Sequence, residues 1–293
     1  MSITINDLTR PRGNARSIRD AAATTLMTSS VVLVVIPLAL VIVYVAQRGS
    51  TLFGWNFLTS DIPTTRSAGG GMGPAVAGTL LLTGAATLIS VPLGVMGGIY
   101  LNEYGRSSRP AQILRVLADV MTGVPSIVMG LFIYTFLVLR TQSLSGFAGA
   151  LALAALMLPV VIRATEEMLK LVPDDLRFGS FALGSRRATT ILRVVLPAAL
   201  PGIISGALLA LARAAGETAP LLFVIGITTT TNWSLSGTNT ALSVQIFRNA
   251  TQPFEGAQQR AWAAALTLIL IAFTFTLLAR LLSTLLTRRS GTR

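Results

Sequence analysis

Long apolar segments separated by short polar ones give the sequence its main pattern. A helix needs about 20 predominantly apolar residues to cross the hydrocarbon core of a bilayer. Six segments come close to this length: Leu26–Ala46, Pro74–Leu101, Val116–Leu139, Gly146–Ile162, Leu200–Ile227 and Ala261–Ala279. The pattern therefore predicts an all-α, polytopic protein of the cell membrane with six transmembrane helices.

The first apolar segment follows a basic run, so it could also be a signal peptide. Its apolar stretch is longer than the roughly 7–15 residues of a signal h-region, and Tyr44 and Gln47 would make a poor cleavage site. We therefore predict that this segment is retained as a transmembrane helix.

Basic residues predict the orientation of the helices, because Arg and Lys are enriched in cytoplasmic loops. Most of them lie before the first segment, between the second and third, between the fourth and fifth, and after the sixth. The opposite connections carry fewer: Arg48, Arg66, Arg140, Arg248 and Arg260. Both termini are therefore predicted to be cytoplasmic, which agrees with an even number of spans.

Composition narrows the chemistry that the chain can perform. Only 12% of its 293 residues are charged, against about 25% in soluble domains. It has no His and no Cys, which excludes thiol chemistry, His acid–base catalysis and ordinary zinc or haem sites. The net charge is +12, but the basic residues are scattered between apolar segments, so we predict neither a metal site nor nucleic-acid binding.

The longest charged connection, residues 163–199, is predicted to be cytoplasmic and to form two short helices. Pro173 followed by Asp174 and Asp175 is a favourable helix start, because acidic side chains suit the positive N-terminal end. Gly184 is a favourable stop, and residues 186–196 can form the second helix.

Phe178, Phe181 and Leu183 place apolar side chains on the first of these short helices. One interpretation is that they pack against the underside of the transmembrane bundle. The other, which we favour, is that they are presented to another protein.

The third apolar segment contains the sequence GVPS at residues 123–126. Pro125 lacks an N–H and tends to break or kink a helix, and Gly123 adds backbone freedom. The stretch is therefore either a packed kink or a broken helix whose free amides, near Ser126, line a polar pathway suited to an anion. Asp119 precedes it and is expected to be interfacial or paired with a basic residue.

Two ionisable residues, Arg213 and Glu217, interrupt the fifth apolar segment. Gly202, Gly206 and Ala210 precede them at four-residue steps and form a small-residue stripe on which a neighbouring helix can pack. We expect the two charged residues to be adjacent on this packed seam. They are either a salt bridge that joins helices or part of a transport pathway, and intramembrane charges favour the pathway.

The connection after the fourth segment resembles a loop shared by the membrane subunits of ABC importers. Gly184 is followed by nine residues, then by Val194, Val195 and the pair Leu196-Pro197, which fits the second half of the family pattern. The first half departs from it, because Phe178, Gly179 and Ser180 replace Glu-Ala-Ala. In the family this loop is the coupling helix that lies in a cleft of the ATPase subunit.

Four further stretches resemble the PstA-type permease subunits of phosphate ABC importers, in the binding-protein-dependent transport system inner-membrane component family. They are AGGGMGPAVAGTLLLT (68–83), GVPSIVMGLF (123–132), ATEEMLKLVPDDLR (164–177) and RAAGETAPLLF (213–223). The resemblance covers roughly residues 50–290. It implies a type I importer permease bundle over residues 26–287, with the coupling loop at 163–199 and cytoplasmic tails at 1–25 and 288–293.

The resemblance also implies a function and a set of partners. The chain would be a transport subunit rather than an enzyme, forming half of a phosphate pathway beside a homologous, PstC-like permease. It has no nucleotide-binding G-x-x-x-x-G-K-[ST] loop, so ATP and Mg would bind to a PstB-like ATPase dimer and this chain would bind no cofactor. A PstS-like phosphate-binding protein would dock on the external loops 48–73 and 228–260.

The resemblance assigns roles to single residues. Arg213 would donate hydrogen bonds to the phosphate oxyanion, and Glu217 would orient Arg213, contact phosphate or accept its proton. Arg163, at the predicted end of the fourth span, would be either a topological anchor or a second Arg on the path. The coupling surface would comprise Asp174, Asp175, Phe178, Phe181, Gly184, Leu196 and Pro197.

Two other classes of function stay open on the sequence. A related importer could carry another oxyanion or a small solute, although a neutral sugar would have little use for Arg213. An intramembrane enzyme lacks clustered carboxylates within the spans, and a passive channel would not explain residues 173–197.

Overall fold

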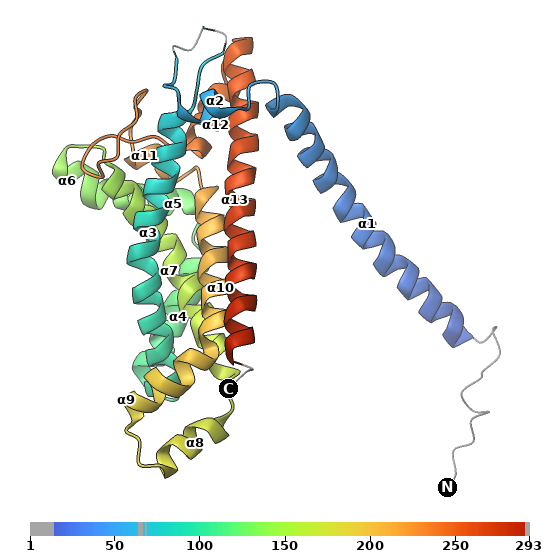
Figure 1. Ribbon diagram of the computed structural model, residues 1–293, viewed down its shortest axis with the longest axis vertical. Coiled ribbons are helices and arrows are strands. Elements are labelled where there is room, and N and C mark those ends of the chain that lie inside the picture. Colours follow the sequence, from blue (N-terminus) through green and yellow to red (C-terminus); the bar gives the residue numbers. More distant parts are fainter. Residues whose placement is uncertain (1–14, 64–66, 68, 291–293) are drawn as a thin grey trace. The chain divides into compact units, whose positions relative to one another are not determined.

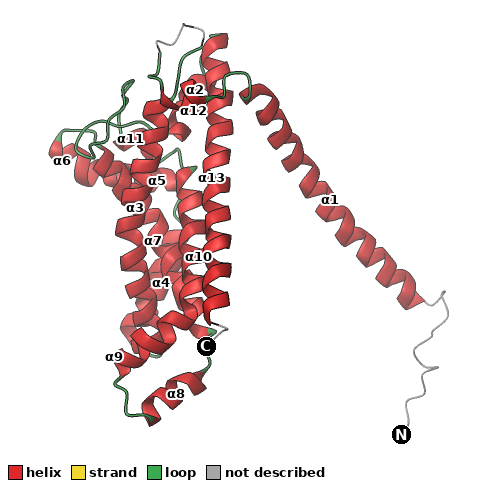
Figure 2. Cartoon of the chain, in the orientation of Figure 1, coloured by secondary structure: helices red, strands yellow, loops and turns green. Residues whose placement is uncertain are grey.

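The computed structural model describes residues 15–63, 67 and 69–290, and these residues form helices and loops only (Figure 2). Residues 1–14 and 291–293, which belong to the predicted tails, and residues 64–66, including Arg66, and 68 lie outside the described residues, as do the side chains of residues 15–17 and 286–290. The chain divides into two compact units, Met1–Arg48 and Gly49–Arg293.

The first unit consists, in its described part, of one long helix, α1 (Ala15–Gly49), which contains Pro37. It starts earlier than the predicted Leu26, and the residues before Leu26 include the good helix formers Arg19 and Ala21–Ala23. Its segment Ile18–Gly49 is long and apolar enough to cross a membrane, and that it is retained stays a prediction.

The second unit contains the remaining elements (Figure 1). In chain order they are α2 (Trp55–Thr59), α3 (Gly73–Ile99), η2 (Tyr100–Tyr104), α4 (Arg109–Gly123), α5 (Ser126–Ile133), η3 (Tyr134–Val138), α6 (Leu139–Thr141), α7 (Gly146–Lys170), α8 (Asp174–Ala182), α9 (Arg187–Thr190), η4 (Ile191–Val195), α10 (Leu196–Ala215), α11 (Leu221–Val224), α12 (Leu242–Ala250) and α13 (Glu255–Ser290). Within this unit α8 and α9 lie at one end of the bundle, and α2, α11 and α12 lie at the opposite end (Figure 1).

Six spans were predicted, and the described residues contain five unbroken ones. Besides the one in α1 they are Gly73–Tyr104, Gly146–Lys170, Arg187–Ala215 and Glu255–Leu285. The sixth is the pair Arg109–Gly123 and Ser126–Thr141, which passes the same test of length and composition together but is bent by 105°. The all-helical membrane fold is therefore confirmed, with the third predicted span broken.

Small residues bring the central helices close together. On α3, a Cβ atom at Gly94 would lie 2.6 Å from Val161 of α7, and one at Gly98 would lie 2.5 Å from Thr165. On α10, a Cβ atom at Gly206 would lie 2.5 Å from Ala164 of the same helix α7. Helices in lipid gain stability from such close packing, so α7 forms the centre of the bundle with α3 and α10 against it.

The fifth span differs from the prediction at both ends. It begins at Arg187 and ends at Ala215, whereas Leu200–Ile227 was predicted. Pro220 cannot donate a backbone hydrogen bond and disfavours helical geometry in the residue before it, so residues 216–220 form a turn before the short α11. At the other end the π-helical turn η4 lets the chain continue as a helix into Pro197 and Pro201.

The charged connection predicted over residues 163–199 is also shorter in the structure. Helix α7 continues through Arg163 to Lys170, and the next span begins at Arg187, which leaves residues 171–186 between them. The helix tolerates these charged residues because they are paired with one another and with α4, as described below.

The close approach of α3 to α7 generates a stability prediction. We expect Gly98→Val to lower the free energy of unfolding by about 1–3 kcal/mol, because the added side chain would overlap Thr165. Thermal unfolding of the detergent-solubilised protein measures this. Gly84→Val on the same helix is the matched control, since no atom lies within 4 Å of a Cβ there. Equal transition temperatures for the two variants would contradict the packing argument.

Candidate functional site

The first part of the candidate site is the break between helices α4 and α5. Helix α4 ends at Gly123, and Val124 is extended with φ −69° and ψ 127°. Pro125 forces this conformation on the residue before it and then caps α5, which begins at Ser126. Of the two interpretations of GVPS, the broken helix is confirmed.

A cavity of about 250 Å³ lies beside this break. Its wall is formed by Val124, Pro125 and Ser126, by α7 at Val160, and by the end of α10 at Arg213 and by Glu217, among others. Gly123 is not part of the wall. Two features far apart in the sequence, the helix break and the Arg213–Glu217 pair, therefore meet at one place.

Arg213 was predicted to lie on the packed seam, and in the structure it does not. The small-residue stripe continues from Ala210 to Ala214, which are both buried, at four-residue spacing. Arg213 is offset from Ala214 by about 100° around the helix, and its side chain is 72% exposed at the open side of the cavity. The prediction was wrong because the stripe of small residues at four-residue steps continues to Ala214, and Arg213 is one position away from it.

Glu217 also differs from its predicted place on the helix. Helix α10 ends at Ala215, so Glu217 lies in the following turn, where its carbonyl accepts a hydrogen bond of 2.9 Å from the Ser243 hydroxyl. Its carboxylate Oε1 is 3.9 Å from Arg213 Nε, and its side chain is 21% exposed. This is a loose ion pair, which leaves the Arg213 guanidinium donors available.

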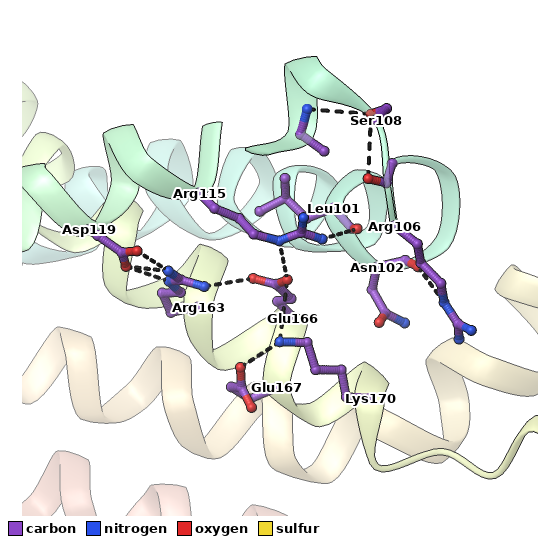
Figure 3. Close-up of polar contacts among 12 residues, drawn as sticks. Leu101, Asn102, Arg106, Ser108, Arg115, Asp119, Arg163, Glu166, Glu167 and Lys170 are labelled. Carbon is purple, nitrogen blue, oxygen red and sulfur yellow. Dashed lines mark hydrogen bonds and ion pairs between the residues drawn. The ribbon is translucent and has the colours of Figure 1, made fainter. Parts of the chain in front are cut away.

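A second ionic group surrounds Glu166 on α7 (Figure 3). Its carboxylate has no exposed surface and accepts from Arg115 Nε at 2.7 Å and from Arg163 Nη1 at 3.1 Å, with Lys170 Nζ at 3.4 Å. Arg115 also donates to the Leu101 carbonyl at 2.8 Å. The carboxylate thus joins α4 and α7, and Arg115 joins both to η2, the π-helical turn that follows α3.

Arg163 lies within α7, one to two turns before its end, which corrects its predicted position at the end of the span. Its Nε donates to Asp119 Oδ1 at 2.8 Å, and its Nη2 contacts both oxygens of the same carboxylate. The expectation that Asp119 is paired with a basic residue is confirmed. That Arg163 contacts the transported substrate stays a prediction.

Sequence reasoning missed Glu166 and Arg115. The signal for Glu166 was present, since it is three residues from Arg163 and four from Lys170, the spacings at which side chains meet on a helix. No comparable signal exists for Arg115, whose partner is 51 residues away in the chain.

The end of the bundle near α8 carries a further buried ion pair. Arg177 Nη2 donates to Glu103 Oε1 at 2.8 Å, and both side chains are 7% exposed. Arg177 also donates to the carbonyls of Leu169, at 3.0 Å, and Val172, at 2.7 Å. These contacts hold α8 against η2 and against the end of α7 with the residues that follow it, and neither Arg177 nor Glu103 was predicted to do so.

The predicted coupling residues fall into two groups. Asp174 and Asp175 form the first turn of α8, and Gly184 ends the turn after it with φ +80°, as the sequence indicated. A hydrogen bond from Arg106 lowers the pKa of Asp174, so its carboxylate stays charged at the helix start. Leu196 and Pro197 lie apart from this group, at the start of α10.

The apolar side chains of this segment are exposed: Phe178 by 66%, Phe181 by 43% and Leu183 by 89%. The interpretation that they pack under the bundle is therefore wrong for this chain. That they contact another protein stays a prediction.

The buried carboxylate of Glu166 provides a matched test with its neighbour. We expect Glu166→Gln to reduce the free energy of unfolding by about 1–3 kcal/mol, because it removes a charge shared by three partly exposed cations. Glu167→Gln should cost less than about 1 kcal/mol, since that side chain is 57% exposed. Thermal unfolding of both variants measures the difference. A larger loss of stability for Glu167→Gln than for Glu166→Gln would contradict the claim that the buried carboxylate contributes more to stability.

Comparisons with known proteins agree on a family. Residues 90–291 match the family model described as binding-protein-dependent transport system inner membrane component. The chain is 42% identical to the phosphate transport system permease protein PstA 1 of Mycobacterium tuberculosis over 96% of this chain and 93% of that one. It is 47% identical to the phosphate transport system permease protein PstA of Yersinia pestis over 76% of each chain.

Two solved structures are similar in fold. One is a bacterial ABC transporter involved in the import of the acidic polysaccharide alginate, with a TM-score of 0.62 and 16% identity over 91% of this chain and 96% of that chain. The other is the MetNI methionine ABC transporter in inward-facing conformations, with a TM-score of 0.61 and 18% identity over 72% of this chain and 94% of that chain.

Proposed function

The chain belongs to the binding-protein-dependent transport system inner membrane component family, and on this premise we propose that it is the PstA-type membrane subunit of an ATP-driven importer of inorganic phosphate. The observation that carries the proposal is the cavity in which Arg213 faces the start of α5. Relatives that are 40–47% identical and named as phosphate permeases supply the substrate class.

Arg213 is suited to hold phosphate on its way through the membrane. Its guanidinium offers planar N–H donors that match an oxyanion and a charge that does not titrate. Glu217 lowers the net charge beside it, so the anion is attracted without being held too tightly. The free amides at the start of α5, beside Ser126, add a positive helix end to the same cavity.

The cavity is open on one side of this chain, which points to a second permease subunit. A side chain with the charge of Arg213 and an exposure of 72% is costly to leave against lipid. A homologous, PstC-like subunit would close this side, so that phosphate passes between the two chains and each supplies half of the pathway.

The driving force would come from a separate ATPase dimer, PstB-like, which holds ATP and Mg. Helix α8 would be the contact, because its apolar residues Phe178 and Phe181 are exposed at the predicted cytoplasmic end. Arg177 would pass the motion of α8 to η2 through Glu103 and to α7 through the Leu169 carbonyl. A PstS-like phosphate-binding protein would dock at the opposite end of the bundle, where α2 and α12 of the predicted external loops lie (Figure 1).

Replacing Arg213 tests the proposed pathway. We expect Arg213→Gln to reduce uptake of radiolabelled phosphate by at least about tenfold, the loss expected when a charged hydrogen-bond donor is removed from an anion. Arg213→Lys should lose part of the activity, because it keeps the charge but not the planar fork. Arg140→Gln, an exposed Arg outside the cavity, is the control and should keep normal uptake. Normal uptake by Arg213→Gln would remove Arg213 from the pathway.

The coupling role of α8 has its own test. We expect Phe178→Ala to weaken retention of the ATPase during purification of the solubilised transporter by about 30-fold or more, because exposed aromatic residues commonly dominate interfaces. Trp233→Ala is the control: Trp233 is 65% exposed but lies in the loop after α11, so ATPase retention should not change. Undiminished retention by Phe178→Ala would exclude this surface as the docking site.

A further inference from the structure

The ion pair between Asp119 and Arg163 lies next to the cavity, in the direction of α8. On α7, Val160 lines the cavity and Arg163 follows three residues later. On α4, Thr122 lines the cavity and Asp119 precedes it by three residues. Three residues are about one helical turn, or roughly 5 Å. An anion that leaves the cavity toward α8 therefore meets this pair next.

The two carboxylates that bind Arg163 are held very differently. Glu166 has no exposed surface and is fixed by Arg115 and Lys170 as well as by Arg163. Asp119 is 57% exposed, and among the described residues Arg163 is the one cation that pairs with it. Of the two, Asp119 is the carboxylate that can leave Arg163 without exposing a buried charge.

The balance of charges in this group indicates which kind of ligand could replace Asp119 on Arg163. The group contains three cations, Arg115, Arg163 and Lys170, and three carboxylates, from Asp119, Glu166 and Glu167 (Figure 3). When Asp119 moves away, the Nε and Nη2 donors of Arg163 are left without an acceptor. A tetrahedral oxyanion offers two oxygens at a spacing that this fork can bind.

We propose that Asp119 is a displaceable internal carboxylate that occupies Arg163 in the absence of substrate and yields it to phosphate leaving the cavity. The inference rests on the proposed function and adds to it a residue that tunes the affinity for phosphate and its release. A tethered carboxylate competes at an effective concentration of roughly millimolar. Asp119 therefore keeps Arg163 from binding phosphate tightly and returns to it when the anion moves on, which speeds release.

The experiment compares variants of the complete transporter, assembled with its partner subunits but without the binding protein. Equilibrium binding of radiolabelled inorganic phosphate to the solubilised complex is measured beside uptake in cells. We expect Asp119→Asn to bind phosphate about two- to fivefold more tightly, the size expected when a partly exposed ion pair is removed. The maximal rate of uptake should fall because release becomes slower.

Two further variants make the result specific. Asp119→Asn combined with Arg163→Gln should show no gain in affinity, since the fork that binds the anion is gone. Glu167→Gln is the matched control: Glu167 is as exposed as Asp119 but pairs with Lys170 and not with Arg163, so affinity should stay at the wild-type value. If Asp119→Asn fails to assemble, Asp119→Ser provides the same test.

Unchanged or weaker phosphate binding by the Asp119 variants would overturn the inference, because it would mean that Asp119 only holds Arg163 in place. An equal gain in the Arg163→Gln background would also overturn it. The proposed function fails in a different way, namely if the wild-type complex binds and takes up no phosphate. The two failures are therefore distinguishable.

Discussion

An ionised carboxylate that is shielded from solvent must be neutralised by its neighbours, because its desolvation costs several kcal/mol. Removing one partner of a buried ion pair lowers the free energy of unfolding by about 3–5 kcal/mol. Glu166 is in this position, with Arg115 and Arg163 bonded to its two oxygens and Lys170 close by. Satisfying this one group fixes α4 against α7 and lets α7 remain helical through its charged last turns. The cavity depends on the same contact, since α4 and α7 form part of its wall.

Helix α7 connects the separate parts of the site along a single axis. Val160 faces the cavity, Arg163 and Glu166 follow at successive turns, and the Leu169 carbonyl accepts a hydrogen bond from Arg177 on α8. A continuous helix therefore links the contact with α8 to the ion pairs and to the cavity wall. The close glycine contacts with α3 extend the same rigid body to a second span.

Much of this arrangement was predictable from local sequence. Apolar length predicted the spans, because lipid admits only segments whose backbone groups are satisfied internally. Pro125 predicted an irregularity in the third span, either a kink or a break, and Pro173 with Asp174 predicted the start of α8, since both depend on a few adjacent residues. The pair of Arg213 and Glu217 was singled out by its charge alone, although its predicted packing was wrong.

The sequence by itself determined which segments are apolar enough to span a membrane, that the third of them is interrupted at Pro125, and that Arg213 and Glu217 bring charge to the end of the fifth. Only the tertiary structure decided how those charges pair, because Arg115 and Glu166 are 51 residues apart and Arg177 and Glu103 are 74 apart. It also decided that Arg213 points into a cavity instead of a packed seam. Local patterns specify helices through backbone hydrogen bonds, whereas the pairing of charges depends on which helix faces meet.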